Sequence, residues 1–164
     1  MTQKLLGAIN LRVSLLLSLF LLLGTAVAQS TTPITELAAN VITVKQAYVH
    51  AIPAGNKNTG AFMEIFNNGK FSHTLIAATS SIAAQTQLQV TFFKQGFSEY
   101  SKARTRSTRD FAILPGKSEK FQPGGHKITF IDLKQHLRVG EKVNLVLVFS
   151  DGSSKTIMAP VRAS

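Results

Sequence analysis

The sequence predicts an all-β fold, a two-sheet sandwich, and three observations carry this prediction. From residue 41 onward, turn-forming residues recur, often about ten residues apart, as sandwiches require. The segments between them alternate apolar and polar side chains, the pattern of strands with one buried face. No apolar stripe has the 3.6-residue period of a helix over a useful length, although residues 81–85 allow one helical turn.

The turns and strands can be placed in chain order. Turn signals fall at Pro53-Ala-Gly55, Asn67-Asn-Gly69, Gln95-Gly96, Pro115-Gly116, Pro123-Gly-Gly125, Val139-Gly140 and Asp151-Gly152. The strands expected between them are Val41–Val49, Ala61–Phe66, His73–Ala78, Thr86–Phe93, Phe111–Leu114, Lys127–Leu133, Lys142–Phe149 and Thr156–Val161.

Two of these strands are the most informative. Thr86–Phe93 places Leu88, Val90 and Phe92 on one face and polar side chains on the other. Lys142–Phe149 is apolar on both alternating faces, which predicts a central strand. The Asp-Gly pair at 151–152 then suits a tight hairpin turn.

Length and composition exclude several classes of protein. The 164 residues suit one ordinary domain, and the chain contains no cysteine, which removes thiolate chemistry, cysteine zinc sites and iron–sulfur clusters. Its 18 basic and 8 acidic residues give a net charge of +10, so the chain should favour anionic partners. The acidic residues form no close cluster, which argues against a calcium or magnesium cage.

The first 28 residues read as an export signal. Basic Lys4 and Arg12 precede an apolar run, 13–23, too short to span a bilayer, and Ala26 and Ala28 suit cleavage before Gln29. No cysteine follows, which excludes lipoprotein processing. We therefore expect a signal peptide at 1–28, a flexible leader at 29–40 and one domain at 41–164, released into a bacterial periplasm.

Seven local patterns follow one another along the expected domain: Val44-Lys-Gln-Ala-Tyr-Val-His50, Thr59-Gly-Ala-Phe-Met63, Phe66-Asn-Asn-Gly69, Leu75-Ile-Ala-Ala-Thr-Ser-Ser81, Leu114-Pro-Gly116, Gln122-Pro-Gly-Gly125 and Leu145-Val-Leu-Val-Phe149. Over about residues 41–161 they resemble the patterns of the PCu(A)C copper chaperones. Their order and spacing carry the resemblance. It implies a cupredoxin-like sandwich that holds Cu(I) and passes it towards a terminal oxidase, hence a periplasmic protein partner in oxidase assembly.

The resemblance also implies a ligand set of two His and two Met, because Cu(I) prefers imidazole and thioether donors. Here the strand His falls on Gln89, the first Met near Tyr100 or Arg106, and the His-x-Met pair on Lys127 and Thr129. From residue 74 to 125 the sequence contains neither His nor Met. We therefore expect a divergent member of the family with weak or lost Cu(I) binding.

Two histidines offer a surrogate metal site. His126 directly follows the Pro-Gly-Gly turn, and His50 ends the first strand. The alternative is that both are ordinary, partly exposed strand-end residues, and period-two geometry points His126 away from Lys127. His73 and His136 read as loop or edge residues. Met63 and Met158 are expected in the core rather than as ligands.

A basic stretch at 101–110 is the second unusual feature. It holds four cations among Ser and Thr: Lys102, Arg104, Arg106 and Arg109. In an extended chain the first three share one face and form a line of positive charge. This predicts either a surface for an anionic partner or a solvated loop.

Other functions find less support. The cations are not interleaved with aromatic residues, which argues against nucleic acid. Catalytic motifs such as Gly-x-Ser-x-Gly and His-Glu-x-x-His are absent from the sequence, so we expect no enzyme. We expect a monomer.

Overall fold

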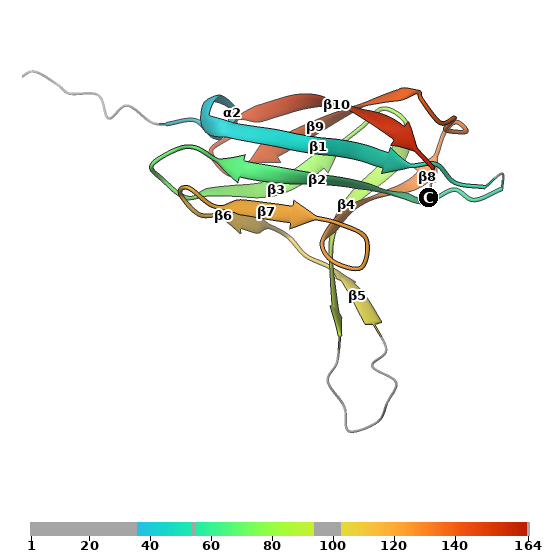
Figure 1. The fold of residues 1–164 in the computed structure, drawn as a ribbon, viewed down its shortest axis with the longest axis horizontal. Coiled ribbons are helices and arrows are strands. Elements are labelled where there is room, and N and C mark those ends of the chain that lie inside the picture. Colours follow the sequence, from blue (N-terminus) through green and yellow to red (C-terminus); the bar gives the residue numbers. More distant parts are fainter. Residues whose placement is uncertain (1–35, 54, 94–102, 164) are drawn as a thin grey trace, which may run out of the picture. The chain divides into compact units, whose positions relative to one another are not determined.

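A computed structural model describes residues 36–53, 55–93 and 103–163 (Figure 1). One short helix, α2 (Ala38–Val41), precedes the strands. The strands are β1 (Ile42–His50), β2 (Thr59–Asn67), β3 (His73–Thr79), β4 (Ala83–Phe93), β5 (Ala103–Ser107), β6 (Phe111–Ile113), β7 (Ser118–Phe121), β8 (Lys127–Leu133), β9 (Lys142–Phe149) and β10 (Ser154–Arg162). The predicted signal peptide and leader residues 29–35 lie outside the described residues.

The strands form two sheets that share β10. The first runs β5-β4-β8-β2-β1, with β7 also paired to β2, and the second runs β10-β9-β3-β6. Residues 154–160 of β10 pair with β9, and Val161 and Arg162 then pair in parallel with Val49 and His50 of β1. The predicted all-β, two-sheet sandwich is confirmed.

Alternation along the strands builds the core between the sheets. In β8, Ile128 and Phe130 are fully buried while Lys127 and Thr129 are half-buried. In β9, Val143, Leu145, Leu147 and Phe149 point inward. Each such side chain contributes about 1.5–3 kcal/mol to folding. Among the described residues, no helix is long and apolar enough to cross a membrane.

A β-bulge in β1 reverses which side chains face outward. Gln46 has a left-handed backbone (φ 52°), and the register with β2 shifts between Lys45 and Tyr48. Lys45 pairs with Glu64 before the bulge, and Tyr48 pairs with Phe62 after it. The bulge therefore puts Tyr48 and His50 on the same outer face as Lys45, with Val49 buried.

Several local expectations were wrong. The structure has strands at β5 and β7 that we did not assign, and residues 83–85 belong to β4 rather than to a helical turn. Residues 38 and 39 of the expected flexible leader are held against the sandwich, because Asp151 and Ser153 accept hydrogen bonds from the backbone of Ala38 and Ala39. Met158 is 61% exposed rather than part of the core. The β9–β10 hairpin and the central position of β9 are confirmed.

Candidate functional site

Two of the positions where copper ligands fall by resemblance are joined by a polar network. Gln89 on β4 is the strand partner of Lys127 on β8. Thr129 Oγ1 donates to Gln89 Oε1 at 2.7 Å, and Gln89 Nε2 donates to Gln87 Oε1 at 3.3 Å. Ser107 on β5 extends the network by donating to the same oxygen of Gln87 at 3.1 Å. Tyr100 lies outside the described residues.

The chemistry of this network does not suit Cu(I). Gln89, Lys127 and Thr129 offer an amide, an ammonium and a hydroxyl, which are poor donors to a soft ion, and the charge of Lys127 would repel it. Within the described ranges, no group of three or more His, Cys, Asp or Glu side chains is arranged to hold a metal ion.

His126 and His50 have different surroundings. His126 Nδ1 lies 2.5 Å from Glu119 Oε1, and its ring packs on Phe111, with centroids 4.6 Å apart. Phe111 is buried, whereas the side chain of His126 is 32% exposed, so His126 covers the edge of the core. His50 packs against Tyr48 and Phe62, with centroids 5.4 and 4.7 Å apart. The structure therefore does not bring the two imidazoles to a common point.

Two hollows flank the ring cluster of Tyr48, His50 and Phe62. One, of about 300 Å³, is lined by His50, Ile52, Asn58, Thr59, Gly60, Phe62, Lys127 and Thr129. The other, of about 430 Å³, is lined by Gln46, Tyr48, Met63, Glu64, Lys120, Phe121, Gln122 and Arg162. Met63 is 3% exposed and belongs to the core, as expected.

The basic stretch is partly described. Lys102 lies outside the described residues, Arg104 and Arg106 are two positions apart in β5, and Arg109 is exposed in the following loop. Arg109 lines a hollow of about 390 Å³ together with Ser107, Thr108 and residues of β3 and β4.

Sequence reasoning missed a buried histidine. His73 is 6% exposed, and its two ring nitrogens face two carboxylates: Nε2 lies 3.4 Å from Glu36 Oε1, and Nδ1 lies 3.7 Å from Asp151 Oδ2. Because the carboxylates approach opposite nitrogens, the three groups form a chain of polar contacts and not a metal cage. His136 is exposed in a loop, as expected.

Both carboxylates are held mainly in the charged form. Burial raises the pKa of Glu36, but hydrogen bonds from the Lys70 and Phe71 N–H groups and contact with His73 outweigh it, so the pKa lies below its usual value. Burial likewise raises the pKa of Asp151, and bonds from Ala38 and Ser153 bring it below normal. The carboxylates fasten residues 36–39 to the sandwich.

Comparisons with known proteins place this site in context. The model of a family described as "Putative lipoprotein LpqE-like" matches residues 42–161. A relative, "Putative lipoprotein Lxx21020" of Leifsonia xyli subsp. xyli (strain CTCB07), is 35% identical over 124 residues, which are 76% of this chain and 71% of the relative.

Solved structures share the fold. A copper-bound PCuAC domain from PmoF2 superposes with a TM-score of 0.63 at 20% identity, covering 79% of this chain and 98% of that domain. The Cu(I) form of DR1885 from Deinococcus radiodurans, solved in solution, gives 0.60 at 25% identity, covering 84% and 87%. The expected cupredoxin-like sandwich of the PCu(A)C type is confirmed, on a chain without that type's His and Met ligands at the described positions.

Proposed function

This chain belongs to the LpqE-like family, and we propose that it is an exported copper-chaperone-type protein whose own Cu(I) binding is weak or lost. The PCu(A)C-type fold supports the class of protein, and the copper-bound state of two structural neighbours supports copper as the relevant metal. The present sequence contains no cysteine to which a lipid could be attached, in contrast to the family's name.

The hydrogen bond between Thr129 and Gln89 is the observation that carries the loss of binding. These side chains satisfy each other where the resemblance places a Met and a His, and Lys127 adds a positive charge beside them. A Cu(I) ion entering here would have to replace a hydrogen bond with contacts to hard donors, which it binds poorly.

A chaperone-type protein without tight copper binding would act through another protein. We place it in the periplasm as a non-enzymatic monomer that assists copper handling towards a terminal oxidase, together with the assembly proteins of that oxidase. The family supports an envelope-associated location, and the net positive charge supports an anionic partner surface.

Anaerobic Cu(I) titration of residues 29–164 against a strong chromogenic chelator tests this proposal. We expect the chelator to keep the copper. Tight one-to-one transfer to the protein would overturn the loss of the site. His126→Ala and His50→Ala variants, titrated in parallel, would show whether any residual binding comes from the surrogate histidines.

A second candidate is an interaction module that binds an anionic partner through Lys102, Arg104, Arg106 and Arg109. The exposure of Arg109 beside a hollow supports it. In this case, capture of envelope proteins on the immobilised chain should weaken as salt rises from 50 to 300 mM. Capture that persists unchanged in a Lys102/Arg104/Arg106→Ala variant would exclude this surface.

A further inference from the structure

The outer face of β10, β1, β2 and β8 is a second cationic surface, separate from residues 102–109. Strand register places Lys45 opposite Glu64, and Glu64 opposite Lys120, so these three side chains share the face. Arg162 and Lys127 line the two hollows on the same face. Lys45 and Lys120 thus flank Glu64, which lines the same hollow as Arg162 and whose carboxylate already accepts a 2.8 Å hydrogen bond from Ser118 Oγ.

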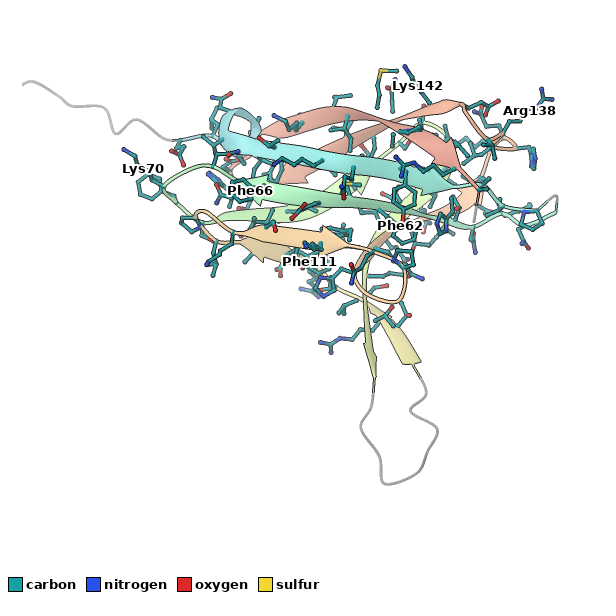
Figure 2. All side chains as sticks on the ribbon, in the orientation of Figure 1. Phe62, Phe66, Lys70, Phe111, Arg138 and Lys142 are labelled. Carbon is teal, nitrogen blue, oxygen red and sulfur yellow. The ribbon has the colours of Figure 1, made fainter. Side chains whose placement is uncertain are left out.

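Two of the cations on this face, Arg162 and Lys45, lie over aromatic rings. The Arg162 guanidinium lies 4.9 Å from the centre of the Tyr48 ring, and Lys45 Nζ lies 5.8 Å from that of Phe66. Tyr48 and Phe62 pack together with centroids 5.3 Å apart and form a ridge between the hollows. Phe62 and Phe66 are labelled along β2 in Figure 2. Rings that fix a guanidinium in place reduce the entropy lost when it binds a carboxylate.

The two hollows offer matching chemistry at a defined separation. The larger one presents Arg162 and Lys120, with the amides of Gln46 and Gln122 and the carboxylate of Glu64, so its two cations outnumber its one anion. The smaller one presents Lys127, with the imidazole of His50 as a polar neighbour. Arg162 on β10 and Lys127 on β8 are three strand spacings apart, about 14 Å, and the register offsets them by two residues along the strands, so their backbones lie about 16 Å apart.

We infer that this face binds an extended acidic segment of a partner protein, with one carboxylate in each hollow. In an extended peptide, residues four apart point to the same side and are about 13 Å apart, and the long side chains of Arg162 and Lys127 can span the remaining difference of about 3 Å. The residue midway between them also points to that side and would lie on the Tyr48–Phe62 ridge. The preferred motif is therefore acidic-x-apolar-x-acidic.

A peptide fits this surface better than a membrane or a nucleic acid. Phe62 is 5% exposed and cannot insert into a bilayer, and of the large apolar side chains exposed in the described residues, Met158 of β10 is the only one on the four strands of this face. Base stacking needs an open ring face, whereas Tyr48, His50 and Phe62 pack on one another. This inference holds whether or not Cu(I) binds.

Fluorescence anisotropy with a labelled peptide, Gly-Glu-Ala-Leu-Ala-Glu-Gly, tests the inference. We expect saturable binding to residues 29–164 that weakens about tenfold between 50 and 300 mM salt. A peptide with its glutamates two apart and one with Lys in place of Glu should bind at least about fivefold more weakly. Equal binding of all three peptides would overturn the motif.

Substitutions locate the surface. Arg162→Gln and Lys127→Gln should each raise the Kd about fivefold or more, and together they should abolish saturable binding. Lys142→Gln and Arg138→Gln, which Figure 2 places beside β9 and β10, serve as charge-matched controls and should stay within about twofold. Unchanged binding in the double variant, with an unchanged Tm, would overturn the proposal, as would preferred binding to phosphatidylglycerol vesicles or single-stranded DNA.

Discussion

Thr129 on β8 donates a 2.7 Å hydrogen bond to the side chain of Gln89 on β4, across two paired strands. These are two of the positions where copper ligands fall by resemblance. Neighbouring strands therefore still hold the positions close together, while the side chains on them bind each other.

Restoring donors at these positions should restore copper binding. A triple variant, Gln89→His with Lys127→His and Thr129→Met, supplies two imidazoles and a thioether and removes the opposing charge. We expect one-to-one Cu(I) binding at least about 100-fold tighter than that of the unaltered chain, measured by anaerobic chelator competition. Gln89→Asn with Lys127→Gln and Thr129→Val breaks the same network without adding donors and should gain nothing. A folded triple variant that binds no better would refute the inferred positions.

Acid should destabilise the protein through the carboxylates beside His73. Glu36 and Asp151 have pKa values below the ordinary 4.5 and 3.8, so each stabilises the fold fully above its ordinary value. That stabilisation is lost as the pH falls through the lowered values. Urea unfolding at pH steps from 6 to 3 should show a declining free energy of unfolding. An Asp151→Asn variant should be less stable at pH 6 and decline less steeply, and parallel curves would contradict this account.

Gly69 leaves room for the carboxylate of Glu36. A Cβ at this position would lie 2.0 Å from Glu36 Oε1 and 2.9 Å from Val41 Cγ2. In a Gly69→Ala variant, the carboxylate should swing away and lose its bonds to Lys70 and His73, so the variant should have a lower Tm than the unaltered chain. Thermal unfolding of Gly69→Ala, Glu36→Gln and the double variant checks this. The double variant should be little worse than either single one, and full additivity would show that Glu36 does not move.

Asn67 should be one of the most sensitive polar residues. It is fully buried, and its Nδ2 donates to the carbonyls of Phe71 and Ile113 at 2.8 and 2.9 Å, while its Oδ1 accepts from Gly69. Asn67→Ala leaves these groups unpaired and should cost about 2–4 kcal/mol in urea denaturation. Asn67→Asp, which keeps the shape but cannot donate to two carbonyls, should also destabilise the fold. A loss below about 1 kcal/mol in both would show that water replaces the amide.

Strong alternation made much of the fold predictable. The expected bounds of β8, Lys127–Leu133, and β9, Lys142–Phe149, agree with the structure. The alternation pattern assigns side chains to the wrong face where a bulge interrupts the strand. The bulge at Gln46 exchanges the two faces of β1, so Tyr48 and His50 reach the outer surface. β7 was missed because its four residues, SEKF, hold one deeply buried side chain and no repeating pattern.

The sequence predicted which strands carry the residues of the candidate site, but not which of these residues contact one another. β4 pairs with β8, and this pairing brings Gln89 and Lys127 together. The order of the strands along the sequence does not specify which strands pair. From the sequence we expected His73 to be a loop or edge residue. It is buried beside Glu36 and Asp151, which lie far from it along the chain. Tertiary contacts of this kind leave no signal in a window of neighbouring residues.

The position of β10 also constrains how the chain reaches its native state. Val161 must find Val49, while Ile157 in the same strand pairs with Leu145. Neither sheet is complete until β10, which is synthesised long after β1, has paired with β1 and β9. We therefore expect the formation of this long-range pairing to be the slow step of folding. An intermediate that still lacks β10 would expose the unpaired edges of both β1 and β9, and we expect holdase chaperones to recognise it at that stage.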